Sequence, residues 1–323
     1  MRLRAHRGST FLLLLVLTFL FVDVSESISF APAIGLLIRS RQIPSLLRRV
    51  TATKWFSKIL NKLKSLFNRL IKIGDTVDGL SQVKDFLDLF GYFNSTVHHS
   101  NFTDVFTVNL QSAIEKFQKN FNLKVTGELD KEVHEIITQP RCSVADIING
   151  TTTMNSGEAN TTSFKPWWKT GDKNLTYAFN PQNNVTDGVR SLFRDAFDKW
   201  SKVVTTLNFT ETASFNASDI KIAFVRFDGK GGIVGGAYTN YSVHAGGIYL
   251  DAEEEWVLPS DELSEDGEVD LESVVMHEIG HLLGLGHSSV EEAIMYPVVL
   301  HEKKIDLAND DLKRIHQINY EVK

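Results

Sequence analysis

The segment from His277 to His287 constrains this chain most, because it follows the pattern H-E-x-x-H-x-x-G-x-x-H. Residues four apart lie on one helix face, so His277 and His281 can direct both imidazoles at one ion. A continuous helix would carry the third histidine roughly 15 Å beyond the first. Gly284 permits the positive φ that ends a helix and turns the chain back. His287 can then complete a three-histidine zinc site whose fourth position is open to water, as in catalytic zinc sites.

Two features accompany these ligands. Glu278 follows the first histidine and is expected to hold a metal-bound water as general base. Met295, Tyr296 and Pro297 follow downstream, as in a Met-turn. The chain therefore resembles the metzincins and, within them, the matrixins (matrix metalloproteinases). The resemblance implies that Met295 is an apolar floor beneath the zinc, and that Tyr296, Pro297 and residues 298–300 form one wall of a substrate pocket.

The resemblance implies a secreted, zinc-dependent metalloendopeptidase that is made as a latent zymogen. One departure leaves an alternative open. The matrixins usually hold a second, structural zinc, but the corresponding ligand positions include Gly236 and Tyr249 here, so we expect that site to be absent. A catalytically degenerate, matrixin-like binding protein is therefore the competing class. The intact histidines and Glu278 argue against it.

Cys142 is the only cysteine. In a secreted chain it cannot form an internal disulfide, so its thiol is free, intermolecular or bound to metal. Its surroundings, Pro140 to Asp146, resemble the matrixin cysteine switch, in which a propeptide thiolate occupies the open zinc position. The family usually has glycine at Ser143 and proline at Ala145, so the sequence leaves the tightness of latency open. A buried, unreactive cysteine is the alternative.

The N-terminus has the pattern of a secretory signal over residues 1–27, with basic residues followed by an apolar stretch from Phe11 to Val22. That stretch is shorter than a membrane span, and no apolar tail ends the chain. We expect a protein of the extracellular space, matrix or apoplast with no stable membrane anchor. Nine glycosylation sequons fit this route. They are Asn94, Asn101, Asn149, Asn160, Asn174, Asn184, Asn208, Asn216 and Asn240.

Residues 164–323 carry 15 Lys and Arg against 26 Asp and Glu, and no Lys or Arg occurs from Gly231 through Glu302. This balance disfavours nucleic acid as a partner and favours bound cations. The resemblance implies a structural calcium site, since calcium takes six to eight oxygen ligands. The expected ligands are the side chains of Asp228, Asp251 and Glu254 and the carbonyls of Gly229, Gly231 and Ile233. A solvated acidic turn is the alternative.

Helical periodicity predicts helices over Leu80–Phe93, Val108–Phe121 and Lys131–Ile137. This block resembles the peptidoglycan-binding-like prodomain of the matrixins, and residues 118–127 resemble the plant-type members. Before it, the basic segment 54–72 also has helical spacing. It either packs on its own domain or binds a membrane surface.

In the second half, strands are expected at residues 175–179, 220–225, 237–238 and 247–250. Helices are expected at 187–207, 271–284 and 307–320. The expected organisation is a signal (1–27), a propeptide (28–148), an exposed activation linker (149–163) and a catalytic domain (164–323). The fold class is α+β: a helical prodomain, then an α/β/α metzincin domain with a mixed twisted sheet.

No hemopexin-like domain is recognised, so we expect specificity to come from the cleft. The expected cofactors are one catalytic Zn²⁺ and a structural Ca²⁺. The expected partners are extracellular protein or peptide substrates, with activation by another protease or by autoprocessing. We expect a monomer.

Overall fold

The computed structural model describes residues 70–93, 101–154, 167–168, 174–239, 245–259, 268–299 and 306–318. The signal segment, the basic segment up to residue 69, most of the linker and the sequons at Asn94, Asn160 and Asn240 lie outside these ranges. The described residues all belong to one structural unit, residues 49–323. Within them, no helix is long and apolar enough to cross a membrane.

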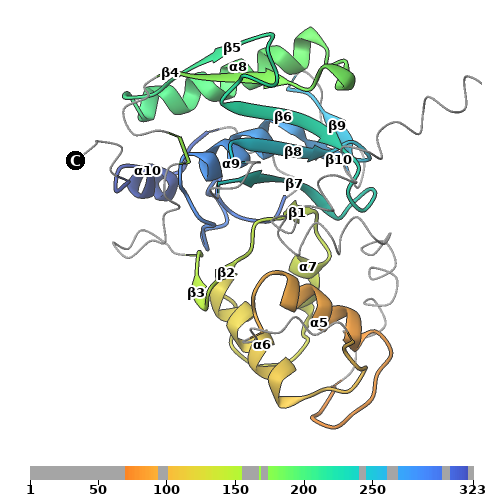
Figure 1. Ribbon diagram of the computed structural model, residues 1–323. Coiled ribbons are helices and arrows are strands. Elements are labelled where there is room, and N and C mark those ends of the chain that lie inside the picture. The colour runs from red at the N-terminus through yellow and green to blue at the C-terminus, as the bar shows by residue number, and fades with distance from the viewer. Residues whose placement is uncertain are drawn as a thin grey trace, which may run out of the picture. The chain divides into compact units, whose positions relative to one another are not determined.

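The first described part is helical, with α5 (Leu80–Leu89), α6 (Val108–Asn120) and α7 (Lys131–Ile137) (Figure 1). Helices α6 and α7 begin at Thr107 and Asp130, whose side chains accept from backbone N–H groups in the first turn. Helix α5 ends before the predicted Phe93, because Gly91 adopts a φ of 89°.

Three short strands follow: β1 (Arg141–Cys142), β2 (Ile147–Ile148) and β3 (Thr151–Thr152). Strands β2 and β3 form an antiparallel hairpin. Its turn residues, Asn149 and Gly150, have φ values of 51° and 77°, which suit asparagine and glycine. The predicted linker begins at Asn149, within this turn, so its first residues belong to the hairpin.

The main sheet has the order β1-β7-β8-β6-β4-β5. Its other strands are β4 (Asn174–Phe179), β5 (Asn208–Glu211), β6 (Ile220–Val225), β7 (Ile233–Tyr238) and β8 (Gly247–Asp251). Strand β7 is antiparallel to β8, whereas the other pairs are parallel, so the sheet is mixed. Strand β1, from the segment predicted as propeptide, forms the edge next to β7. A second, two-stranded sheet pairs β9 (Glu255–Val257) with β10 (Glu268–Asp270).

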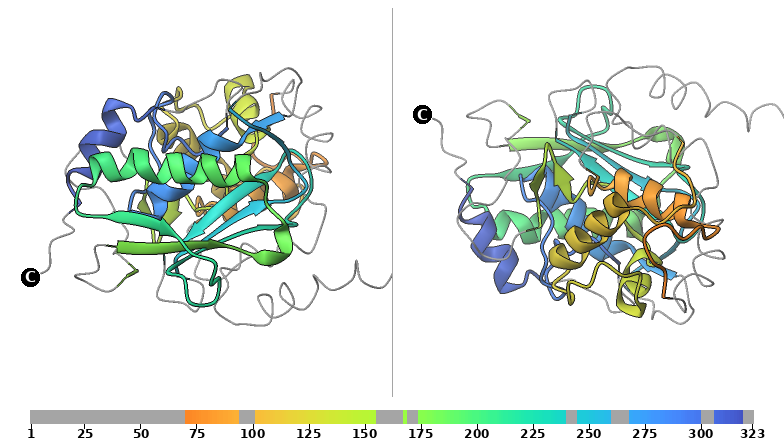
Figure 2. Two further views of the ribbon diagram at one scale, coloured as in Figure 1. Left: turned by 90° about the horizontal axis from the view of Figure 1, so that it is seen from above. Right: turned by 90° about the horizontal axis from the view of Figure 1, so that it is seen from below.

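Helices α8 (Asp187–Val203) and α9 (Leu271–Leu282) pack against each other, and a short α10 (Asn309–Ile315) follows (Figures 1 and 2). A 3₁₀ turn (Pro181–Asn183) precedes α8. Trp200 of α8 is fully buried, and its indole N–H donates to the carbonyl of Met276 at 3.0 Å. One apolar core joins both helices to β4, β6 and β8. The predicted fold class, a helical domain followed by a domain around a mixed sheet, is confirmed.

Candidate metal centre and catalytic site

Helix α9 and the turn after it bring the three predicted histidines together. His277 and His281 lie one turn apart on α9, and Gly284, at a φ of 103°, reverses the chain toward His287. Cys142 of β1 lies among them. One ligand atom from each of these four buried residues falls within 4.8 Å of the others. The arrangement of three imidazoles and one thiol suits a tetrahedral zinc ion.

The ring orientation of each histidine is fixed by a contact through Nδ1. That atom lies 2.7 Å from the Ile294 carbonyl in His277, 2.8 Å from the Leu285 carbonyl in His281, and 2.9 Å from Oδ1 of Asp146 in His287. Such partners hold the proton on Nδ1 and leave Nε2 as the metal-binding atom. Nε2 of His287 is buried without a hydrogen-bond partner among the described residues.

Burial also sets the charge of these ligands. It lowers the pKa of His281 and His287, which keeps the imidazoles neutral, as metal binding requires. Burial, and then the carboxylate of Glu278, raise the pKa of the Cys142 thiol. Its Sγ lies 3.5 Å from Nε2 of His281. A thiolate at this position needs a cation beside it, and zinc at the three histidines would supply the charge.

The segment around Cys142 lies between two other segments of the same chain and forms hydrogen bonds with both. On one side, the Arg141 and Ser143 N–H groups donate to the carbonyls of Gly232 and Gly235 at 2.9 and 2.8 Å. On the other, the Cys142 N–H donates to the Pro297 carbonyl at 2.9 Å. Strand β1 therefore occupies the backbone edge of β7.

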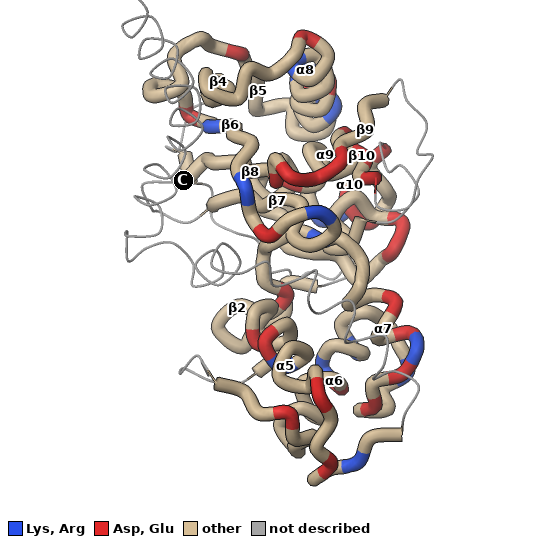
Figure 3. The backbone as a smooth tube through the Cα atoms, turned by 90° about the vertical axis from the view of Figure 1, so that its right-hand side faces the viewer, with Lys and Arg blue, Asp and Glu red and all other residues tan. Residues whose placement is uncertain are grey.

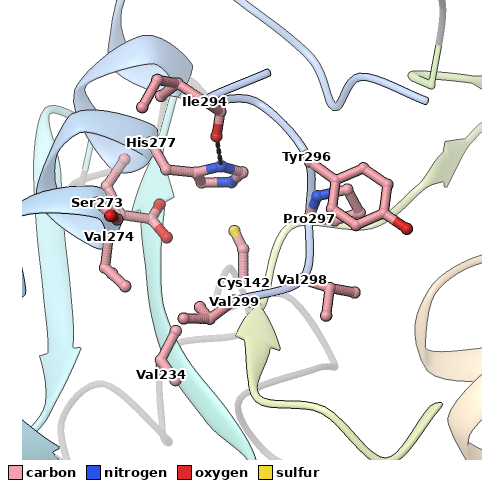
Figure 4. Close-up of a pocket in the computed structure, with 11 residues that line it drawn as sticks. Cys142, Val234, Ser273, Val274, His277, Ile294, Tyr296, Pro297, Val298 and Val299 are labelled. Atoms are coloured by element: carbon pink, nitrogen blue, oxygen red, sulfur yellow. Dashed lines mark hydrogen bonds between the residues drawn. The ribbon is translucent and has the colours of Figure 1, made fainter. Parts of the chain in front are cut away.

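A pocket opens beside Cys142 (Figure 4). In the view, the sulfur of Cys142 and the ring of His277 face the same space, and Tyr296, Pro297 and Val298 come from the Met-turn and the residue after it. Most of the lining side chains are apolar. They include Val234, Val274, Ile294, Val298 and Val299, together with Ser273 and Tyr296. The pocket can take an apolar side chain.

Met295 is fully buried next to helix α9, which carries His277 and His281. A Cβ atom added at Gly280 would lie 2.3 Å from its sulfur, so helix and Met-turn are in direct contact. Asp311 of α10 supports this turn from behind, accepting from the backbone N–H groups of Ile294 and Met295 at 2.9 and 3.1 Å. The sequence pattern did not indicate the role of Asp311.

Glu278 is fully buried next to Cys142. Burial raises the pKa of its carboxyl to about 8, while the Cys142 thiol and the Ala237 N–H act in the opposite direction. A carboxylate next to the metal centre can accept a proton and later return it, as a general base must.

Asp146 connects the switch to the metal centre. Its carboxylate binds Nη2 of Arg141 at 2.7 Å and accepts from the Tyr92 hydroxyl at 2.8 Å, besides its contact with His287. Burial alone would raise its pKa, but the charge of Arg141 and the bond from His287 outweigh this and hold it at about 2. The Arg141 guanidinium also lies 3.4 Å from the ring centroid of Phe90. The contributions of Tyr92 and Phe90 had no sequence signal.

The predicted calcium ligands gather around the loop between β6 and β7. Asp228, Asp251 and Glu254 are all buried. Burial, the largest cause, raises their pKa values to about 8, 6 and 7. Oδ2 of Asp251 and Oε2 of Glu254 have no hydrogen-bond partner among the described residues. The acidic run after β8 is drawn red in Figure 3.

The backbone of this loop also binds the acidic side chains. Gly229 and Gly231 have φ values of 92° and 85°. The Gly231 N–H donates to Glu254 at 2.8 Å, and the Ile233 N–H donates to Asp228 at 3.2 Å. These bonds hold the acidic side chains at the loop, where a cation would offset their mutual repulsion.

The sequons within the described residues are all exposed, which is compatible with glycans. They are Asn101, Asn149, Asn174, Asn184, Asn208 and Asn216.

Comparison with known proteins agrees with both parts of the fold. The matrixin family model matches residues 167–320, and a peptidoglycan binding domain model matches residues 76–137. Metalloendoproteinase 2-MMP of Arabidopsis thaliana is 45% identical over 272 residues, covering 76% of this chain and 71% of its own. Metalloendoproteinase 5-MMP of the same plant is 44% identical, covering 76% and 72%. Metalloendoproteinase 1 of Glycine max is 42% identical, covering 76% and 83%.

Proposed function

Because this chain belongs to the matrixin family of zinc metalloendopeptidases, we propose that it is secreted as a latent zymogen and cleaves extracellular proteins or peptides. The observation that carries this proposal is the convergence of Cys142 with His277, His281 and His287. A thiol in the fourth position would exclude the water that peptide hydrolysis needs.

The three histidines would hold the metal through Nε2. When bound, zinc lowers the pKa of a water and polarises the scissile carbonyl. Glu278 takes the proton of that water on its carboxylate and later delivers it to the leaving amine.

Activation then requires removal of the strand that carries Cys142. We place the cleavage in the linker 149–163, after a propeptide of residues 28–148, and we place the catalytic domain at 164–323. Another protease or a second copy of the enzyme would cut there. Once β1 has left, the edge of β7 can pair with an extended peptide substrate.

The pocket beside Cys142 supports a substrate class. Its apolar lining favours a substrate with an apolar side chain next to the scissile bond. The proposal also includes a structural calcium at Asp228, Asp251 and Glu254, glycans at exposed sequons, and a monomer in the extracellular space or apoplast.

A peptidase assay tests this function. The full-length chain is treated with a mercurial that modifies thiols, and cleavage of peptides with apolar residues is followed. We expect cleavage after treatment, its loss with a zinc chelator and its recovery with added zinc. A zinc-loaded, thiol-modified protein that cleaves none of the peptides in a random library would favour the alternative, a matrixin-like binding protein without turnover.

A further inference from the structure

Ser143 and Gly236 lie in direct contact across the edge of the sheet. A Cβ atom added at Gly236 would lie 1.9 Å from Oγ of Ser143 and 3.3 Å from its Cβ. Both residues are buried. The Ser143 side chain therefore occupies the volume that any other residue at position 236 would fill. Rotating the hydroxyl would remove the shorter contact but leave the tight contact between the two Cβ atoms.

We call the volume over Gly236 that Ser143 occupies the recess. The strand register shows which residues border it. Gly236 pairs with Tyr249 on β8, so a side chain at 236 would lie on the same face as Tyr249. Tyr238, two residues along β7, shares that face. The two tyrosine rings contact each other edge to face at a centroid distance of 5.2 Å. The recess thus has glycine as its floor and an aromatic pair at its side.

The two residues are also two of the departures from the family pattern. Ser143 stands where the switch usually has glycine, and Gly236 stands at a lost ligand position. The two departures are linked in space, because Ser143, which directly follows β1, fits only if position 236 on β7 has no side chain.

We propose that Ser143 and Gly236 are a matched steric pair, and that Gly236 determines which side chains can lie against the face of β7 that carries Tyr238 and Tyr249. In the latent chain, Ser143 fills the recess. After activation, the recess becomes a subsite that accepts a bulky apolar or aromatic side chain of the substrate against Tyr238 and Tyr249. The second part rests on the proposed peptidase function, and the first part does not.

The latent state is tested through the single cysteine. All proteins are full-length, zinc-loaded and carry Glu278→Gln, so that none processes itself, and the rate of Cys142 alkylation by iodoacetamide is measured. We expect Gly236→Ala to raise this rate roughly tenfold, as overpacking loosens the strand. Ser143→Gly should stay close to the parent. Combining both substitutions should return the rate to that of Ser143→Gly, because the clash is gone.

Two results of this cycle would overturn the proposal. One is a Gly236→Ala protein that labels as slowly as the parent, since the recess would then be unnecessary. The other is a double variant that labels as fast as Gly236→Ala alone, since the alanine would then act through something other than Ser143. Alanine suits the backbone at this position, because the φ of Gly236 lies outside the left-handed region.

The active state is tested with mercurial-treated enzyme from which residues 28–148 have been processed and removed, and with a peptide series in which each residue before the scissile bond is varied among Gly, Ala, Leu and Phe. We expect the Gly236→Ala enzyme to lose roughly tenfold in kcat/KM for Leu or Phe at one position, and little for Gly there. An equal change for all peptides would contradict a subsite. If no peptide is cleaved by either enzyme, the proposed function fails, while the alkylation result still decides whether the steric pair exists.

Discussion

Oδ1 of Asp146 lies 2.9 Å from Nδ1 of His287, so the Asp146 carboxylate orients a histidine of the metal centre. The same carboxylate neutralises the fully buried Arg141. Two side chains of this segment reach the metal centre: Cys142 faces the histidine cluster directly, and Asp146 bonds to one of its members. Cleavage of the propeptide would remove both contacts together.

Asp146→Asn should open the latent form. The substitution keeps the shape but leaves the charge of Arg141 buried without its partner, which costs roughly 3–5 kcal/mol. We expect faster alkylation of Cys142 and a lower urea midpoint for the full-length chain. Lys131→Ala is the control, because its ion pair with Glu135 is exposed and should contribute little. Equal effects of the two variants would show that the Asp146 contacts do not hold the switch.

Cys142→Ser should release the enzyme without any cleavage. A serine hydroxyl is a poor zinc ligand compared with a thiolate, so water can enter the fourth position. We expect the full-length variant to cleave peptides directly or to process itself, and to gain nothing from a mercurial. If the untreated wild type is as active as the variant and the mercurial changes neither, the cysteine is not a switch.

The clustering of the three histidines could be predicted because its geometry is local. The spacing of His277, His281 and Glu278 within one helix, with Gly284 after it, determines where the side chains point. The bounds of α7 and β6 were also predicted correctly, since each has a clear capping or alternation signal.

Other elements could not be predicted, for physical reasons. Strands of two to four residues, such as β1 and β5, are too short to show alternation. Strand β7 was expected only at 237–238, because Gly235 and Gly236 are disfavoured within strands, yet it begins at Ile233. Long-range contacts such as Asp146 with His287 leave no trace in the local pattern.

Glu278→Gln should abolish turnover while the metal stays. The amide keeps the size of the side chain but cannot accept the proton of the attacking water, so kcat should fall roughly a hundredfold or more. Zinc content by elemental analysis should be unchanged at one per chain. Glu272→Gln on the same helix is the matched control. It weakens an ion pair with Lys199 and should keep most of the activity. Near-normal turnover in a zinc-loaded Glu278→Gln enzyme would show that Glu278 is not the general base.

Calcium should stabilise the protein through Asp251. At a free concentration a hundredfold above Kd, a bound ion adds about 2.7 kcal/mol of stability. We expect calcium to raise the Tm of the wild type and to have a much smaller effect on Asp251→Asn. The asparagine retains an oxygen for the Phe227 and Glu253 N–H groups but carries no charge. Asp219→Asn, at an exposed position, should respond like the wild type. A calcium-dependent Tm that survives Asp251→Asn would exclude this ligand.

Gly280 allows helix α9 to lie in close contact with Met295 of the Met-turn, so a larger residue at position 280 should disturb the turn. In Gly280→Ala, the new methyl group would meet the Met295 sulfur at 2.3 Å and the Trp200 ring at 3.1 Å. Overpacking of this kind costs about 1–3 kcal/mol, and the displaced turn carries Ile294, whose carbonyl orients His277. We therefore expect a lower Tm together with weaker zinc retention in a chelator competition. Gly188→Ala in α8 is the matched control, because its added Cβ meets only ordinary contacts, the nearest at 3.7 Å, and alanine favours helix. If Gly280→Ala is as stable as Gly188→Ala and holds zinc equally well, the close contact between α9 and the Met-turn is not needed for stability or for zinc binding.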